Sequence, residues 1–155
     1  MEKLLRKALA LAACTLVLQQ VTAAPLNVAL LDTGSHVPSN ARFSQSIQVE
    51  AGPVKVAFDL GRGVTIRLAQ LGIPFRDVTA SFITHSHSDL LVGLPDLWLK
   101  GWLPTPSASP TQPMSIYGPK GTVAMTRNLS AAFAGDIHIR IADESKRSAN
   151  TSILG

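Results

Sequence analysis

The order of apolar and polar positions predicts short strands early in the chain, followed by strands that alternate with helices. Short apolar runs, or alternation with a period of two, are typical of strands. These patterns occur at residues 26–31, 46–50, 54–60, 78–84, 114–117 and 137–141. The second and third segments are separated by Ala51-Gly52-Pro53, which predicts a hairpin turn.

Three other segments have helical spacing, at residues 64–71, 90–102 and 118–134. In the first, Val64, Leu68 and Leu71 fall on one helix face, and Gly72 is a typical residue just past a helix end. Hairpin strands followed by strand–helix alternation predict a mixed α/β domain with helices flanking the sheet.

The two ends of the chain have a different pattern. Residues 1–23 have the order of a signal peptide, with Lys3, Arg6 and Lys7 before a short apolar core and small residues before a cleavage site after Ala23. We therefore expect a periplasmic or secreted protein. Cys14 follows a sequence like a lipobox, so a lipid anchor is the alternative. Residues 24–144 form the expected domain, and residues 145–155 have no periodicity, as a truncated or frameshifted gene would give.

Composition limits the possible partners and ligands. Hydrophobic residues make up 46% and charged residues 15% of the chain, which argues against disorder. Without residues 1–23, eleven Lys and Arg face nine Asp and Glu, so the charge does not favour nucleic-acid binding. Cys14 is the only cysteine. A metal site in the mature protein must therefore use histidines and carboxylates.

The candidate chemistry lies directly after the strand at 78–84. His85 and His87 alternate where the chain is extended, so both imidazoles can turn toward one point. Imidazole is a common zinc ligand, and Asp89 adds a carboxylate two residues later. Sites of α/β proteins lie at the carboxyl ends of strands. The segment therefore predicts half of a hydrolytic metal site.

Residues 85–89 match five of the six positions of the His-x-His-x-Asp-His signature of the metallo-β-lactamase superfamily. Further segments are similar to the ribonuclease Z and arylsulfatase-like branch, at residues 31–35, 58–63, 93–98 and 117–122. The resemblance extends from about Val28 to Glu144. It implies the N-terminal half of an αββα sandwich, with a mixed sheet and flanking helices.

The resemblance also implies roles for the site residues. His85 and His87 would be two of the three imidazoles on a first zinc ion. Asp89 would bind a second ion and orient the attacking hydroxide, which makes it the catalytic carboxylate. Asp59 would steady the loop that bears the histidines. Bound metal lowers the pKa of water to about 7 and so supplies a nucleophile for ester hydrolysis.

The sequence departs from the family pattern at two points. Leu90 occupies the sixth signature position and cannot coordinate a metal, so a second ion should bind weakly. The later ligands of the family have no clear counterpart, because the one later histidine, His138, is expected to face outward from the strand at 137–141. His36 is expected to be a surface loop residue. We therefore expect weak metal binding by this chain.

The sequence predicts an exported, zinc-dependent hydrolase of phosphate or sulfate esters, with a small ester as substrate. One alternative is a ribonuclease Z-like endoribonuclease that cleaves the 3′ end of tRNA. The other is a truncated, non-catalytic remnant, because a half sandwich leaves one sheet face uncovered. Such a face favours aggregation or pairing with a partner, including a homo-oligomer.

Overall fold

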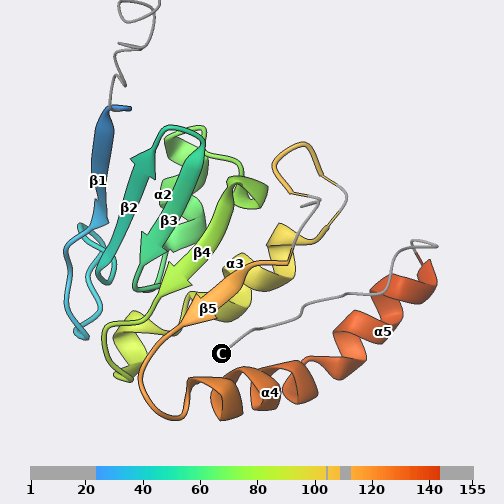
Figure 1. The fold of residues 1–155 in the computed structure, drawn as a ribbon. Coiled ribbons are helices and arrows are strands. Elements are labelled where there is room, and N and C mark those ends of the chain that lie inside the picture. Colours follow the sequence, from blue (N-terminus) through green and yellow to red (C-terminus); the bar gives the residue numbers. More distant parts are fainter. Residues whose placement is uncertain (1–23, 104, 109–112, 144–155) are drawn as a thin grey trace, which may run out of the picture.

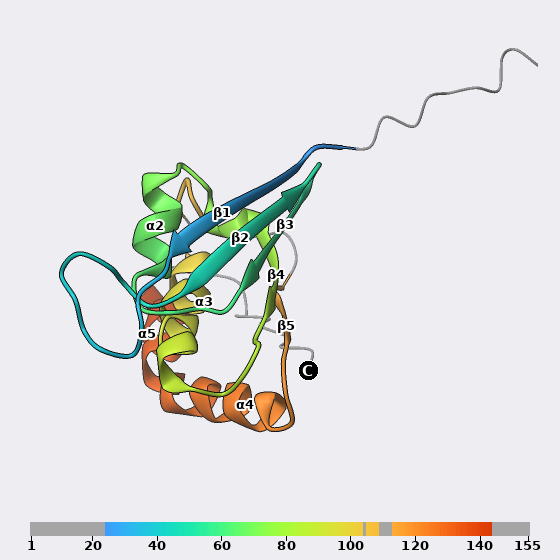
Figure 2. The same cartoon turned by 90° about the vertical axis from the view of Figure 1, so that its left-hand side faces the viewer.

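The computed structural model describes residues 24–103, 105–108 and 113–143 (Figure 1). The predicted signal peptide, the lipid anchor at Cys14 and the tail at 145–155 lie outside the described residues. Helices α2 (Val64–Gln70) and α3 (Leu94–Gly101) lie on one face of a single β-sheet, and α4 (Thr122–Ala132) and α5 (Ala134–Asp143) follow the last strand (Figures 1 and 2). Within the described part of the chain, no helix is both long and apolar enough to cross a membrane.

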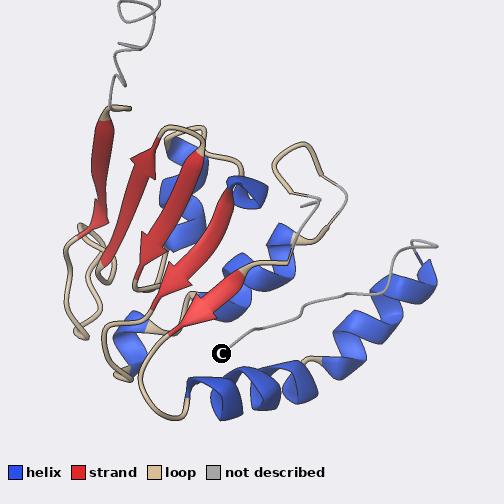
Figure 3. Cartoon of the chain, viewed as in Figure 1, coloured by secondary structure: helices blue, strands red, loops and turns tan. Residues whose placement is uncertain are grey.

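The sheet is mixed, as the sequence predicts (Figure 3). Its strands, in spatial as well as sequence order, are β1 (Leu26–Asp32), β2 (Ser46–Ala51), β3 (Val54–Phe58), β4 (Val78–Phe82) and β5 (Ser115–Tyr117). β2 pairs antiparallel with both β1 and β3, which confirms the predicted hairpin, whereas β3, β4 and β5 are parallel. The carboxyl ends of β1, β3, β4 and β5 therefore meet at one edge of the sheet.

Helix α2 begins and ends close to its predicted position, α3 and α4 begin four residues later than predicted, and α5 includes a segment predicted as a strand. The helices are α2 (Val64–Gln70), α3 (Leu94–Gly101), α4 (Thr122–Ala132) and α5 (Ala134–Asp143), with 3-10 turns η1 (Phe75–Asp77) and η2 (Ser88–Leu90). Gly72 has a φ of 67° just after α2, so its role in ending that helix is confirmed. α3 is shorter than predicted because Pro95 lies in its first turn, where proline favours a helix start.

The strand predicted at residues 137–141 is wrong, because this segment is part of helix α5. Ile137 and Ile141 are half-buried and four residues apart, whereas Ile139 between them is exposed. The Asp136 carboxylate also accepts hydrogen bonds from Arg140 Nε at 3.0 and 3.1 Å, a pair that stabilises one helix face. A segment of five residues with alternating isoleucines fits the period of a strand as well as that of a helix, and the contacts within α5 decide for the helix.

The core lies between the sheet and helices α2 and α3. Its buried apolar residues come from both layers: Leu31, Ala57, Leu60, Val64, Leu68, Val78, Ile83, Leu94, Leu97 and Ile116. Burial of such side chains is worth about 1.5–3 kcal/mol each. This one-sided core fixes the sheet edge on which the candidate site is built.

The opposite face of the sheet is apolar and open. By strand pairing and alternation, it consists of Leu26, Val28, Leu30, Ile47, Val49, Val54, Val56, Phe58, Ala80, Phe82 and Tyr117. Val28 is 57% and Leu30 64% exposed, and none of the described helices covers this face (Figure 2). The uncovered sheet face expected from the sequence is therefore present in the described part of the chain.

Candidate metal centre

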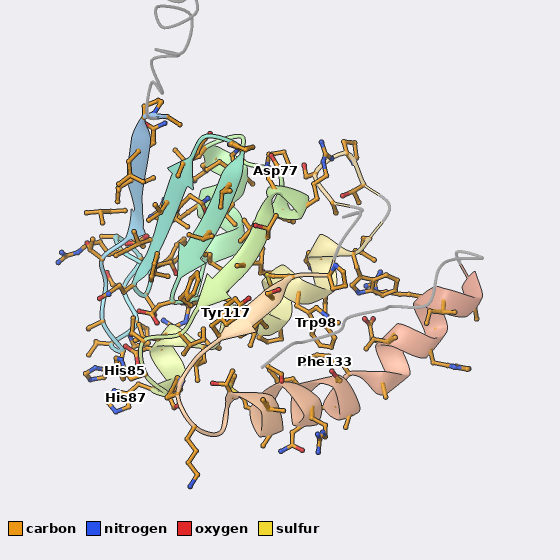
Figure 4. All side chains as sticks on the ribbon, in the orientation of Figure 1. Asp77, His85, His87, Trp98, Tyr117 and Phe133 are labelled. Carbon is orange, nitrogen blue, oxygen red and sulfur yellow. The ribbon has the colours of Figure 1, made fainter. Side chains whose placement is uncertain are left out.

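The candidate centre lies just beyond the carboxyl end of β4, where His85 and His87 lie side by side on the surface (Figure 4). The Nε2 atom of His85 is 3.1 Å from the Nδ1 atom of His87. The two ring centroids are 4.5 Å apart, and the planes meet at 75°. The structure therefore brings together the two imidazoles that the sequence predicts as ligands.

The spacing of these nitrogens fits a shared metal ion. Zinc binds imidazole nitrogen at about 2.0–2.1 Å. If one ion were bound at that distance from both nitrogens, which are 3.1 Å apart, the angle between its two bonds would be about 100°, close to tetrahedral. The distance between the two nitrogens is thus compatible with two ligands of one zinc-sized ion.

Asp59 holds the histidine loop at the carboxyl end of β3. Its side chain is 1% exposed and accepts a hydrogen bond from the backbone N–H of Thr84 at 2.8 Å. Its own backbone N–H donates to the carbonyl oxygen of Phe82, the last residue of β4, at 2.9 Å. Two hydrogen bonds therefore tie the ends of neighbouring strands together directly before His85.

Asp59 has a φ of 57°, the left-handed region that non-glycine residues rarely adopt. Aspartate and asparagine tolerate this conformation better than other side chains. The unusual backbone is therefore compatible with the residue, and it turns the carboxylate into the protein beneath the histidine loop. Such conformations cluster at functional sites.

A second set of backbone contacts anchors the far end of the loop. The Leu60 N–H donates to the Leu90 carbonyl at 2.8 Å, and the Gly93 N–H donates to the Leu60 carbonyl at 2.8 Å. A Cβ at Gly93 would lie 2.3 Å from the Gly61 carbonyl oxygen, so only glycine permits this approach. The segment after β3 thus holds the histidine loop on both sides.

Leu90 and Asp89 lie in the 3-10 turn η2 that follows the histidines. Leu90 is 4% exposed, so the residue at the sixth signature position is a buried apolar residue. Within the described residues, no group of three or more His, Cys, Asp or Glu side chains is placed to hold a metal ion. The roles of Asp89 as metal ligand and catalytic carboxylate therefore stay predictions.

The other histidines lie elsewhere. His36 is exposed in the loop after β1, and His138 is exposed on α5. The important contact that sequence reasoning missed is Thr84, whose hydroxyl oxygen lies 3.1 Å from His85 Nδ1. Its position between an apolar strand and the first histidine was the available signal.

A second buried carboxylate, Asp32, lies at the carboxyl end of β1 and was also missed. It forms two contacts with Arg67 of α2, at 2.8 Å to Nε and 2.7 Å to Nη2. Burial acts to raise the pKa of the Asp32 carboxyl, but hydrogen bonds from Arg67 and from the backbone N–H groups of Phe43 and Thr33 outweigh it and hold the pKa below its ordinary value. Arg67 also lies over the Phe43 ring, so the cluster fixes the loop after β1.

Solved structures with a similar arrangement share one fold. Human tRNase Z, short form, superposes with a TM-score of 0.61 over 69% of this chain and 39% of that chain, at 29% sequence identity. A metallo-β-lactamase fold protein from Bacillus subtilis superposes with a TM-score of 0.59 over 67% of this chain and 42% of that chain, at 16% identity. The mixed sheet with its flanking helices therefore has the metallo-β-lactamase fold.

The chain belongs to the metallo-β-lactamase superfamily, and its similar curated relatives carry the name ribonuclease Z. The protein of that name from Mycobacterium sp. (strain KMS) is 40% identical over 117 residues, which are 76% of this chain and 40% of the relative. The one from Mycobacterium tuberculosis (strain ATCC 25177 / H37Ra) is 36% identical over the same shares. This chain thus spans about 40% of the length of the curated relatives it matches. No protein-family model matches it.

Proposed function

We propose that this protein is a metal-dependent hydrolase of phosphate or sulfate esters, with His85 and His87 as two ligands of its metal ion. The observation that carries the proposal is the 3.1 Å separation of His85 Nε2 and His87 Nδ1 at the carboxyl end of β4. Membership of a superfamily of metal-dependent hydrolases supports the reaction class.

Zinc is the proposed metal because imidazole nitrogens suit it and the distance between the two nitrogens is compatible with one shared ion. When bound, zinc would supply a hydroxide nucleophile near neutral pH and stabilise charge on the ester oxygen. His85 and His87 would bind the ion, and Asp59 orients the loop that carries them. Asp89 is proposed to orient the attacking water, and Leu90 leaves a second ion with a poorer ligand set.

Two substrate classes follow from different observations. The names ribonuclease Z and tRNase Z of the similar proteins favour a phosphodiester in RNA. The near balance of charge outside residues 1–23, together with the proposed export to the periplasm or medium, favours a small ester. A small phosphodiester satisfies both considerations. We place it first, with the sulfate ester and the tRNA 3′ end as alternatives.

The test is zinc binding by the purified chain, measured by elemental analysis and by titration, followed by hydrolysis assays. The variant His85→Ala/His87→Ala removes the pair, and His36→Ala/His138→Ala is the matched control. We expect zinc to bind to the wild type and to the control variant but not to the pair variant. Zinc content that is equal in all three proteins would contradict the assignment of the ligands.

Hydrolysis of bis(p-nitrophenyl) phosphate, p-nitrophenyl sulfate and a tRNA precursor then separates the substrates. Zinc-dependent cleavage of the first compound supports the small phosphodiester. Cleavage of the second or third alone assigns the corresponding alternative. A hydrolytic zinc site usually needs at least three protein ligands, so the imidazole pair alone can bind zinc without forming a catalytic site. Zinc binding without hydrolysis of any of the three compounds would therefore favour the non-catalytic remnant.

A further inference from the structure

Thr84 lies between the buried carboxylate and the imidazole pair. Its hydroxyl oxygen is 3.0 Å from Oδ1 and 2.9 Å from Oδ2 of Asp59, and its backbone N–H also donates to Oδ1. On its other side, the same hydroxyl oxygen is 3.1 Å from Nδ1 of His85. One hydroxyl group thus connects Asp59 with the first imidazole of the pair.

The number of protons determines the direction of these hydrogen bonds. A threonine hydroxyl has one proton to donate, and a carboxylate only accepts. With both Asp59 oxygens within hydrogen-bond distance, the Thr84 proton is directed to Asp59. The Thr84 oxygen can then only accept from His85, so Nδ1 of His85 must carry the proton.

A neutral imidazole carries one N–H, so the Nε2 atom of His85 is left with a free lone pair. We infer that Thr84 is a positioning residue that fixes the tautomer of His85, so that Nε2 faces His87 in the form that binds a metal ion. The value of this arrangement rests on the proposed function. The hydrogen bonds themselves are observed in the structure.

The two imidazoles are therefore not equivalent. With Nε2 of His85 unprotonated, its lone pair accepts a hydrogen bond from the N–H at His87 Nδ1, 3.1 Å away. To bind a metal through Nδ1, His87 must lose that proton from Nδ1 and carry one on Nε2 instead. His85 needs no such change. Thr84 thus prepares one ligand, and the second adjusts when the ion binds.

The conformation of Asp59 makes a sharp test possible. Asparagine tolerates the left-handed region much as aspartate does, so Asp59→Asn keeps the backbone turn. Its amide nitrogen, in the place of Oδ2, donates to the Thr84 oxygen where the carboxylate accepted, whereas its amide oxygen, in the place of Oδ1, still accepts. The Thr84 hydroxyl then donates either to this one oxygen or to His85 Nδ1. The variant should therefore shift the tautomer of His85 toward the form with its proton on Nε2.

The experiment reads the tautomer directly, by 15N NMR of the imidazoles in the full chain without added metal, at about pH 8.5, well above the ordinary pKa of free imidazole of about 6.5. The variants are Thr84→Val, which removes the hydroxyl at similar shape, Thr84→Ser, which keeps it, and Asp59→Asn. We expect the His85 proton on Nδ1 in the wild type and in Thr84→Ser. It should be shared between both nitrogens in Thr84→Val and shift toward Nε2 in Asp59→Asn.

Zinc titration supplies the second measurement. Substitution of a residue that hydrogen-bonds to a metal ligand typically lowers metal affinity by about 10–100-fold. We therefore expect the zinc affinity to fall by that factor in Thr84→Val and by less than about threefold in Thr84→Ser. A wild-type His85 that carries its proton on Nε2, or a Thr84→Val tautomer equal to the wild type, would overturn the inference. If Thr84→Val does not fold, Thr84→Ser and Asp59→Asn decide it. A tautomer that shifts as expected in a chain that binds no zinc supports the inference and rejects the proposed function.

Discussion

Asp32 and Asp59 are buried carboxylates at the carboxyl ends of β1 and β3, at the same edge of one sheet. Asp32 is paired with a cation, because Arg67 contacts it through two nitrogens at 2.7 and 2.8 Å. Asp59 instead accepts hydrogen bonds from the backbone N–H and the hydroxyl of Thr84, both neutral groups.

The difference shows how one residue type serves two purposes. Asp32 bonds Arg67 of α2, and Arg67 also lies over the Phe43 ring in the loop after β1, so these contacts stabilise the fold and do not extend to the histidine pair. The hydrogen bonds of Asp59 continue through Thr84 to His85, so its effect reaches the candidate metal centre. Removal of Asp32 contacts should therefore change stability alone, whereas removal of Asp59 contacts should change both stability and metal binding.

The largest expected effect is that of Asp59→Ala. The change leaves the Thr84 backbone N–H without its acceptor and puts alanine in a left-handed conformation. We expect the free energy of unfolding to fall by about 3 kcal/mol. Urea denaturation measures it, and zinc binding should be lost as well. Asp59→Asn is the control and should lose less than half as much stability, since the backbone conformation is kept. Equal losses in the two variants would contradict this role of the turn.

The next effect is that of Arg67→Met, which leaves the buried Asp32 carboxylate without its cation. Because Arg67 is partly exposed, we expect the free energy of unfolding to fall by about 2 kcal/mol, with zinc affinity unchanged. Lys100→Met, which removes an exposed ion pair with Asp96, is the matched control and should change stability by less than about 0.5 kcal/mol. Weakened zinc binding in Arg67→Met would remove the distinction between the two carboxylates.

A smaller effect of the same ion pair should appear in the pH dependence of stability. Because the pKa of Asp32 is lower in the folded than in the unfolded chain, its contribution is complete above the ordinary aspartate pKa of about 3.9. It is lost as the pH falls below that value and through the lower pKa of the folded chain. Urea denaturation at about pH 6 and about pH 3 should show this loss in the wild type and a smaller one in Arg67→Met. An equal loss of stability in both proteins between these pH values would contradict the contribution of the Asp32–Arg67 ion pair.

Local patterns predicted much of the fold. The hairpin and the end of α2 depend on neighbouring residues, such as Gly52 with its φ of 58° and Gly72. The segment at 137–141 was misassigned because five alternating residues fit two periods, and contacts outside it select the helix. Short apolar segments of this kind are ambiguous without their surroundings.

The candidate site was predictable only in part. The His85 and His87 pair depends on two positions in one extended segment, so the sequence was sufficient. The contact between Asp59 and Thr84 joins residues 25 positions apart through the pairing of β3 with β4. Burial of Leu90 likewise depends on packing that brings the segment after β3 against η2. Contacts of this kind follow from tertiary structure, which no local pattern contains.

The smallest effect on stability is expected from the proposed metal ligands, His85 and His87. His85 and His87 are exposed, and their side chains contact each other and the Thr84 hydroxyl. Exposed substitutions of this kind change the free energy of unfolding by less than about 0.5 kcal/mol. Urea denaturation of His85→Ala/His87→Ala without metal should therefore match the wild type, although zinc binding is lost. Added zinc should raise the stability of the wild type and leave that of the variant unchanged, because only a state that binds the ion gains from it. A large loss of stability in the metal-free variant would mean that the imidazole pair helps to hold the fold, and the division between a structural edge at Asp32 and a ligand-binding edge at Asp59 would fail.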